Sequence, residues 1–271
     1  MDVRGRWVLI TGASSGIGAE YARDFARRGA NLILVARRVD KLEALAQELK
    51  TARAVQIDVV TADLSDPEAP AALFAETRRL GRELYGLINN AGFAVYGPFH
   101  EGSIERNQQQ ILVNVYAPAS LAQMVLPGMV ARGSGFIVNV ASTAAFQPVP
   151  YMANYGASKA FLLSMTEALW AEYRHSGVRI LAVCPGATDT AFFDVAAAPE
   201  ASVGPRDTPP NVVAATWRAL AGNRSHVITG PVTNLLLAQA GRLLPRSFVA
   251  STAEKVMRPK SRRDLPKKNA V

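Results

Sequence analysis

Short apolar runs alternate with amphipathic stretches along most of the chain, and this alternation leaves few folds open to it. Strands of a parallel sheet are buried on both faces and joined by helices, which gives this pattern. Seven strands are predicted, within Trp7–Thr11, Leu32–Ala36, Ala54–Thr61, Tyr85–Asn89, Gly135–Ala141, Val178–Cys184 and Val227–Thr229. Helices are predicted between them, over Ile17–Arg28, Val39–Leu49, Asp66–Leu80, Ser103–Met129, Tyr151–His175 and Asn211–Ala221. The sequence therefore predicts one α/β domain over residues 1–271, a doubly wound parallel sheet with helices on both faces.

Composition narrows the class of protein further. Apolar residues make up 49% of the chain and charged residues 19%, which is typical of a globular protein. Cys184 is the single cysteine, so no intramolecular disulfide is expected, and His, Cys and carboxylate residues do not cluster at metal-ligand spacing. The sequence shows no signal peptide and no uninterrupted apolar run of about 18 residues. We therefore expect a cytoplasmic protein with no metal and no spanning helix.

Basic residues are concentrated near the C-terminal end. The net charge is +8, and most of the excess lies between Ser251 and Val271. Such a tail attracts nucleic acid or an anionic membrane surface, or is simply a solvated terminus. No paired aromatic platform for bases accompanies it, so we expect a solvated tail and no nucleic-acid partner.

A glycine-rich turn follows the first predicted strand and precedes the first predicted helix. Its cofactor-contacting candidates are Gly12, Ser14, Ser15, Gly16, Ile17 and Gly18. Glycine allows a tight turn and close approach of a pyrophosphate, which the N-terminus of the next helix attracts. The spacing G-x-x-x-G-x-G after Thr11 resembles the cofactor signature of the short-chain dehydrogenase/reductase family, which has a Rossmann-like fold. The resemblance covers roughly Arg6 to Thr229, with later motifs in the same order.

The end of the second strand bears on the choice of nicotinamide cofactor. Enzymes that use NAD usually place a carboxylate there to bind the ribose 2′-hydroxyl. Here the sequence is Ala36-Arg37-Arg38, whose two guanidiniums could clamp a 2′-phosphate with help from the Ser14 hydroxyl. We therefore expect NADP(H), with Arg37 as the first contact and Arg38 beside it. The alternative is that both arginines begin a solvated helix.

The resemblance implies further cofactor contacts where other strands end. Asp63 corresponds to a residue that binds the adenine amino group, and Asn90 and Ala91 approach the adenosine ribose. The segment 185–190 resembles the loop on the nicotinamide side. The implied contacts are Asp63, Leu64, Asn90, Ala91, Gly92, Pro185, Gly186, Thr188 and Thr190. Each of these segments could also be an ordinary turn.

A tyrosine and a lysine four residues apart form the candidate proton-transfer pair. Tyr155 and Lys159 lie one turn apart on the predicted helix, so the cation can lower the phenol pKa. Tyr151 has no lysine at this spacing. The resemblance implies that Ser142, after the fifth strand, holds the substrate oxygen, with Thr143 as the alternative hydroxyl. Ser142 could also be a strand-end cap.

The resemblance adds Asn114 as the fourth catalytic residue, holding a water that connects Lys159 to solvent. Family members commonly carry glycine three residues later, where this chain has Ala117 followed by Pro118. In the implied mechanism NADPH delivers a hydride, Tyr155 donates the proton and Ser142 binds the carbonyl oxygen. The predicted activity is interconversion of a ketone or aldehyde and its alcohol.

The substrate end is predicted from apolar loops. By analogy with the family, a lid over residues 187–210 and an extension over residues 231–271 cover the substrate. Aromatic residues expected in this cleft are Tyr96, Phe146, Phe192 and Phe193, followed by Val195 to Ala198. They favour a small apolar carbonyl or alcohol substrate, although they fit core packing equally well.

Two segments are candidates for contacts with other partners. Asn234–Val249 is apolar and carries arginines, so it could lie on a membrane, cover the substrate pocket or pair subunits. Ser103–Met129 and Tyr151–His175 resemble the helices that pair subunits in the family, which implies a homodimer or homotetramer. Two other functions stay open: an NAD-linked alcohol dehydrogenase of the same fold, and a catalytically idle nucleotide-binding scaffold.

Overall fold

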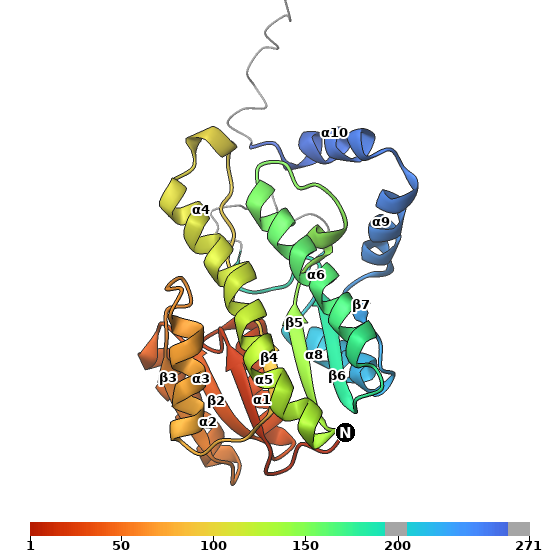
Figure 1. Cartoon of the computed structure of the whole chain (residues 1–271). Coiled ribbons are helices and arrows are strands. Elements are labelled where there is room, and N and C mark those ends of the chain that lie inside the picture. The colour runs from red at the N-terminus through yellow and green to blue at the C-terminus, as the bar shows by residue number, and fades with distance from the viewer. Residues whose placement is uncertain (193–204, 260–271) are drawn as a thin grey trace, which may run out of the picture.

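The computed structural model describes residues 1–192 and 205–259, and its centre is a seven-stranded parallel sheet (Figure 1). The strand order is β3-β2-β1-β4-β5-β6-β7. Consecutive strands run outward from β1 in one direction and from β4 in the other, which creates a switch point between β1 and β4. The strands are β1 (Trp7–Thr11), β2 (Asn31–Ala36), β3 (Ile57–Thr61), β4 (Leu84–Asn89), β5 (Gly135–Val140), β6 (Val178–Cys184) and β7 (His226–Ile228). The predicted doubly wound sheet is confirmed, with each strand inside or within one residue of its predicted segment.

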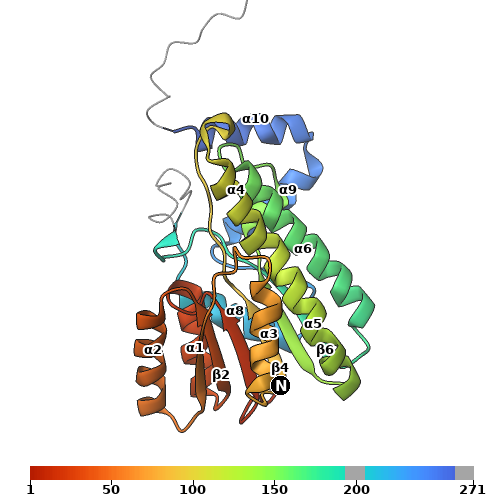
Figure 2. The same ribbon diagram turned by 60° about the vertical axis from the view of Figure 1, so that its left-hand side comes forward.

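Helices cover both faces of the sheet. One apolar core joins the sheet to the first group: α1 (Gly16–Arg27), α2 (Val39–Ala52) and α8 (Pro209–Ala221). A second core joins it to the other group: α3 (Ala69–Arg79), α5 (Ala117–Arg132) and α6 (Ala153–Tyr173). Figure 2 shows the two groups on opposite sides of the strands. Each of the two apolar cores is continuous because the strands and the helices turn their apolar faces toward one another.

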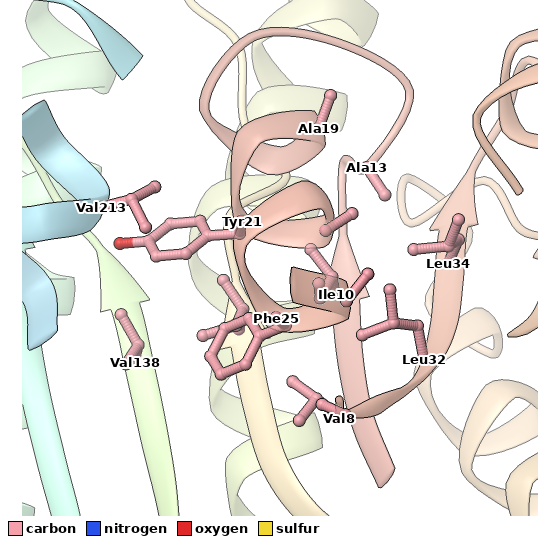
Figure 3. Packing of buried hydrophobic residues seen from close by; sticks show 14 of the residues in the cluster. Val8, Ile10, Ala13, Ala19, Tyr21, Phe25, Leu32, Leu34, Val138 and Val213 are labelled. Atoms are coloured by element: carbon pink, nitrogen blue, oxygen red, sulfur yellow. The ribbon is translucent and has the colours of Figure 1, made fainter. Parts of the chain in front are cut away.

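Aromatic rings fill the core beneath α1. Phe25 is buried and stacks on Phe136 of β5 with ring centroids 5.5 Å apart. Tyr21 lies one turn earlier on the same face (Figure 3), where its hydroxyl shares a 2.6 Å hydrogen bond with Thr216 of α8. Gly86 lies under Phe136, where an added Cβ would come within 2.2 Å of the ring. This packing fixes α1, whose N-terminus faces the glycine-rich turn.

The helix predicted over Ser103–Met129 is interrupted. The chain forms α4 (Ile104–Ile111), a π-helical turn η2 (Leu112–Tyr116) and then α5. The Ala117 N–H donates to the Leu112 carbonyl, five residues back. Pro118 has no N–H to give the carbonyl four residues before it, which accounts for the change in bonding. The wide turn carries Asn114 and turns its side chain into the site.

The helix predicted to begin at Tyr151 begins two residues later, at Ala153. Tyr151 has φ +63°, a left-handed conformation that a non-glycine residue rarely adopts. The turn before it contains the short 3-10 helix η3 (Thr143–Phe146), which Ser142 caps by accepting from the Ala144 N–H at 3.1 Å. The left-handed residue turns its phenol away from the helix, toward the C-terminal segment.

Two helices follow β7 where the sequence pattern was weak. α9 (Val232–Leu243) and α10 (Arg246–Met257) lie beyond the carboxyl ends of the strands, and α10 crosses that end of the molecule in both views (Figures 1 and 2). They correspond to the predicted extension over residues 231–271, whose last residues, 260–271, lie outside the described ones. The predicted lid over residues 187–210 is described at its two ends, where Thr188 forms a parallel bridge with Asp207.

One helical stretch, Ile104–Arg132, is long and apolar enough by length and composition to cross a membrane, which the sequence analysis did not expect. In the described fold Leu121, Val125 and Met129 of this stretch pack against the sheet. Burial of that face in the protein core accounts for its apolar composition.

Replacing Phe25 with alanine tests the aromatic core. The change removes a buried ring and leaves a cavity against Phe136, so we expect the free energy of unfolding to fall by about 3–5 kcal/mol. Equilibrium urea unfolding at fixed protein concentration measures it. Phe161→Ala, at a side chain that is 43% exposed, is the control and should cost much less. Equal losses in the two variants would contradict the packing described above.

Candidate active site

The glycine-rich turn leaves no room for side chains. Gly12 and Gly16 adopt φ +66° and +56°, and a Cβ on Gly12 would lie 2.8 Å from the Asn90 amide nitrogen. A Cβ on Gly18 would lie 2.3 Å from the Gly12 carbonyl oxygen. The loop can therefore be built only with glycine at these positions, and it exposes backbone N–H groups at the start of α1.

Hydrogen bonds clamp the turn to the end of β4. The buried Thr11 hydroxyl donates to the Ile88 carbonyl at 3.3 Å and accepts from the backbone N–H groups of Asn90 and Ala91, both at 3.0 Å. The Asn90 side chain returns two bonds, to the carbonyls of Thr11 and Gly12. Asn90 is thus a brace across the switch point between β1 and β4.

The two arginines after β2 take different positions. One guanidinium nitrogen of Arg38 donates to the hydroxyls of Ser14 and Ser15, at 2.9 and 3.0 Å. Arg37 is exposed, and its charge acts on Asp63 instead. Both arginines line the same cavity as the glycine loop. Arg38, which was expected to be the second contact after Arg37, therefore forms a candidate anion site together with the hydroxyls of Ser14 and Ser15.

Asp63 lies at the other edge of this end of the cavity. Burial acts to raise the pKa of its carboxyl group, but hydrogen bonds from Ser65 and the charges of Arg37 and Arg106 outweigh burial and lower the pKa. The carboxylate accepts from the Ser65 N–H and hydroxyl at 3.0 and 2.8 Å. Leu64 is buried beside it in the core and reaches the cavity wall. An ionised acceptor at this edge suits an exocyclic amine such as that of adenine.

The expected hydroxyl pair meets at the middle of the cavity. Tyr155 is 9% exposed, and burial raises the pKa of its phenol to about 12, opposed by a hydrogen bond with Ser142. The Ser142 hydroxyl also lies 3.4 Å from the Pro185 carbonyl oxygen. β5 brings Ser142 to this point, and α6 brings Tyr155. The two hydroxyls therefore converge on one spot in the cavity wall.

Lys159 lies one turn below Tyr155 and is buried. Its ammonium donates to the Val140 carbonyl at 2.7 Å and lies 5.8 Å from the centre of the Tyr155 ring. Burial lowers the pKa of Lys159 to about 8. Lys159 therefore bonds to the backbone of β5 in this structure, and the phenol pKa is governed by burial.

Asn114 completes the group. Its amide donates to the Phe93 carbonyl at 2.9 Å and to the Ser158 hydroxyl at 3.1 Å, while its oxygen accepts from the Phe93 N–H. Gly92 lies between Asn114 and Lys159: a Cβ there would be 3.1 Å from the Asn114 oxygen and 3.4 Å from the Lys159 ammonium. Glycine at this position keeps the space between the two polar groups open.

The nicotinamide-side loop bends over the glycine turn. The Thr190 side chain lies against Gly16, where a Cβ would come within 3.0 Å of its methyl carbon. Thr188 is buried and donates to the Gly186 carbonyl at 3.1 Å. Pro185, Gly186, Thr188 and Thr190 all line the cavity, as the resemblance implied. The loop also meets Asn234 of α9, which no sequence motif marked and whose amide donates to the Thr229 carbonyl at 2.9 Å.

One cavity of about 750 Å³ joins these features. Every predicted cofactor-contacting residue except Gly18 lines it; Gly18 is buried beneath the loop. Asn114 lies behind the wall. The far end is apolar and is lined by Val149, Met152, Phe192, Leu237, Phe248 and Val249. Such a shape suits a dinucleotide at one end and an apolar molecule at the other.

Only part of the expected aromatic lining is found among the described residues. Phe192 lines the cavity, with its ring centroid 5.4 Å from that of Tyr155. Tyr96 and Phe146 do not line it: Tyr96 packs behind Met152, and Phe146 packs toward His226. The rings of Tyr96 and Phe146 each pack against a small cluster of buried apolar residues. Phe193 and Val195 to Ala198 lie outside the described residues.

Two tyrosines hold α10 over the apolar end. The Tyr151 hydroxyl donates to Glu254 at 2.6 Å, and Glu254 accepts two further bonds from Arg258 at 2.8 and 2.9 Å. The Tyr96 hydroxyl donates to the Met257 carbonyl at 2.7 Å. Sequence analysis missed these contacts because they join residues more than 100 positions apart and carry no local spacing.

The residues present fit a nicotinamide dinucleotide. The glycine loop offers a cradle that a Cβ would fill, and Arg38 with two serines forms an anion site beside it. Asn90 and Ala91 lie along the wall toward Lys159. Such a combination of donors and glycines suits a phosphate-bearing ligand that ends near Tyr155.

Comparison with known proteins identifies the family. The short chain dehydrogenase family matches residues 6–200, and the chain belongs to that family of oxidoreductases. A solved short-chain dehydrogenase from Sphingobium yanoikuyae, in complex with NADPH, is 34% identical, with a TM-score of 0.78 over 98% of each chain. The bulky-bulky ketone specific alcohol dehydrogenase from Comamonas testosteroni is 32% identical, with a TM-score of 0.74 over 88% of this chain and 92% of that one.

Curated relatives carry different functions. Hydroxysteroid dehydrogenase-like protein 1 from Gallus gallus is 36% identical over 183 residues, which cover 67% of this chain and 55% of that protein. The inactive hydroxysteroid dehydrogenase-like protein 1 from Homo sapiens is 33% identical over 185 residues, 67% of this chain and 55% of that one. Ketoacyl reductase HetN from Nostoc sp. is 33% identical over 252 residues, 90% of this chain and 86% of that one. The chain thus spans little more than half the length of the first two relatives.

Replacing Lys159 with methionine tests the buried ammonium. The folded protein releases the Lys159 proton near pH 8, whereas an exposed lysine releases it near 10.5. Between these values the unfolded chain binds more protons, so stability gained from Lys159 rises with pH. We expect the free energy of unfolding of wild type, relative to Lys159→Met, to increase by about 3 kcal/mol over this range. Chemical unfolding at a series of pH values measures the difference. For the control Lys41→Met, at an exposed lysine, the difference in free energy of unfolding should not change with pH. The same result for Lys159→Met would contradict a lowered Lys159 pKa in the folded protein.

Proposed function

We propose that this chain is an NADPH-dependent reductase of bulky apolar ketones or aldehydes. The observation that carries the proposal is the continuity of one cavity. It has an anion site at Arg38, Ser14 and Ser15, the hydroxyls of Ser142 and Tyr155 at its middle, and an apolar end under α10. NADPH-bound relatives and a relative specific for bulky ketones support it.

The residues divide the chemistry among themselves. NADPH, when bound, supplies a hydride for the carbonyl carbon. Ser142 and Tyr155 both donate hydrogen bonds to the carbonyl oxygen, and Tyr155 then transfers its proton to that oxygen. Lys159 would hydrogen-bond the nicotinamide ribose of a bound cofactor, and its charge would stabilise the phenolate that remains on Tyr155.

Proton supply follows from the surroundings of Lys159. A water between Asn114 and Lys159, beside Gly92, would return a proton to the phenolate through the ammonium, and Asn114 would orient that water. Burial raises the pKa of Tyr155 to about 12, so the phenol is protonated at neutral pH. The protonated phenol is the form that the acid step of carbonyl reduction requires.

The face formed by α4, η2 and α6 is proposed to pair subunits. Ile104, Ile111, Tyr116 and Phe161 are large apolar side chains between 43% and 79% exposed on these elements. Exposed apolar side chains that gather on one face are typical of an interface between copies. A homodimer or homotetramer is therefore part of the proposal.

An idle scaffold is the second candidate, because two relatives, from Homo sapiens and Pongo abelii, are called inactive. A protein that had lost the chemistry would be free to lose Ser142, Tyr155 or Lys159. All three residues are present and converge in the cavity. This argument favours the reductase, and turnover decides between the two.

Replacing each arginine separately tests the cofactor. Charge-assisted bonds to a phosphate are worth enough that we expect Arg38→Ala to weaken NADPH binding by about 10- to 100-fold. NADH, without the phosphate, should lose less than about threefold. Fluorescence titration with both nucleotides measures the effect. A larger selective loss of NADPH affinity in Arg37→Ala would mean that Arg37, and not Arg38, is the main contact of the 2′-phosphate. Tighter binding of NADH than of NADPH by wild type would overturn the NADP assignment.

Replacing Tyr155 with phenylalanine tests the chemistry. We expect turnover of a bulky apolar ketone to fall by about 10³-fold, because the general acid is lost. NADPH affinity should change little, because the ring remains. Absorbance of NADPH at its nicotinamide band follows turnover. Tyr173→Phe, which removes a phenol hydroxyl from the same helix, is the matched control. Unchanged turnover in Tyr155→Phe would exclude it as the acid.

A further inference from the structure

The segment formed by α9 and α10 carries many exposed apolar side chains. Of the sixteen large apolar side chains that are exposed among the described residues, eight lie in this short segment. We call these eight the apolar cap: Val232, Leu235, Leu236, Leu237, Leu243, Leu244, Phe248 and Val256. Leu243 is 87% exposed and Leu236 62%. Exposed apolar side chains concentrated in one segment are typical of a contact with another surface.

The apolar cap also forms the rim of the cavity. Leu237, Leu244 and Phe248 are 62%, 44% and 56% exposed, yet each lines the cavity that contains Tyr155. These three side chains, and Val256 with them, therefore combine exposure with a place on the cavity wall. A molecule that leaves a surface in contact with the cap reaches the substrate end of the cavity without crossing water.

The charged residues of α9 and α10 are mainly basic. Arg246 and Lys255 are exposed on α10, and the one carboxylate of α9 and α10, Glu254, is already paired with Arg258 at 2.8 Å. The sequence continues with five more basic residues and one acidic residue: Lys260, Arg262, Arg263, Asp264, Lys267 and Lys268. An apolar face with a basic rim is complementary to an anionic lipid surface.

We propose that the apolar cap docks on an anionic lipid bilayer and admits an apolar substrate from it directly into the cavity. The leucines and Phe248 insert at the level of the lipid headgroups and acyl chains, and Arg246 and Lys255 contact anionic headgroups. In both views α10 crosses the end of the molecule that is opposite α2, so α2 faces away from the bilayer (Figures 1 and 2). The proposal concerns where substrate comes from and goes beyond the reductase activity.

A second copy of the chain fits this face less well. A two-fold contact places the same patch of each subunit against the other. The basic rims of two caps would then meet, and neither cap brings an unpaired carboxylate to offset them. Anionic lipid supplies the opposite charge, which is why the bilayer is the occupant proposed.

Vesicle co-sedimentation of the full chain tests the proposal. One set of vesicles is phosphatidylcholine alone, and the other is equal parts of phosphatidylcholine and phosphatidylserine. Leu236→Glu/Leu243→Glu changes two exposed leucines that do not line the cavity. We expect wild type to bind the mixed vesicles and this variant to bind them at least about tenfold more weakly. The control Val39→Glu/Ala52→Glu adds the same charge to exposed positions on α2 and should bind as wild type does.

Charge is tested separately. Arg246→Gln/Lys255→Gln should lower binding to the mixed vesicles by about tenfold or more and leave binding to phosphatidylcholine unchanged. Lys41→Gln/Lys50→Gln on α2 is the matched control. Wild type that stays in the supernatant with both vesicles overturns the proposal, and so does equal loss in a control pair. Light scattering adds a third readout: a smaller assembly for Leu236→Glu/Leu243→Glu, without vesicle binding by wild type, would mean that a second copy covers the cap.

Failure here is distinct from failure of the reductase. Circular dichroism and NADPH titration show whether each variant is folded, and reduction of a water-soluble ketone does not need the bilayer. Loss of vesicle binding with normal turnover would leave the proposed activity intact. Normal vesicle binding without turnover would leave the docking surface intact and refute the activity.

Discussion

The hydrogen bonds between Thr11 and the turn after β4 are the constraint on which the site depends. At the switch point β1 and β4 pair side by side up to Ile10 and Ile88, and the helices that follow them, α1 and α5, pack on opposite faces of the sheet. The Thr11 hydroxyl and the Asn90 side chain join the ends of the two strands with bonds of 3.0 to 3.3 Å. These bonds hold the glycine loop against β4, and the loop in turn presents the N-terminus of α1. The anion site, the wall toward Lys159 and the position of the cavity all follow from that joint.

Burial determines the protonation chemistry of the two central site residues. Tyr155 and Lys159 are both removed from water, which raises the pKa of the phenol and lowers that of the ammonium. Each group is therefore held closer to its neutral form, because burial penalises the charged form of both side chains. The same burial requires polar partners, which the Val140 carbonyl supplies to Lys159 and Ser142 supplies to the phenol. The hydrogen bonds that satisfy these buried polar groups therefore also hold them in position in the site.

The sequence allowed the sheet and the cofactor end to be predicted because their signals are local. Short apolar runs identified all seven strands, and the spacing of Gly12, Gly16 and Gly18 located the turn. The π turn at Asn114 was not predicted, although Pro118 was visible, because a proline kink has several outcomes that tertiary packing decides. Arg38 could not be ranked above Arg37, since the choice depends on which side chain meets Ser14. The hydrogen bond from Tyr151 to Glu254 and the position of Asn234 beside Gly186 depend on the tertiary fold, and no local sequence pattern indicates them.

The most direct test of the central claim is transfer of label from the cofactor to a ketone. NADPH carrying deuterium at the reactive carbon of the nicotinamide is incubated with the protein and a bulky apolar ketone, and the alcohol is analysed by mass spectrometry. The account predicts an alcohol with one deuterium on its carbinol carbon for wild type and almost none for Tyr155→Phe. Binding of NADPH by wild type with no labelled alcohol from any member of a panel of apolar ketones and aldehydes would contradict it.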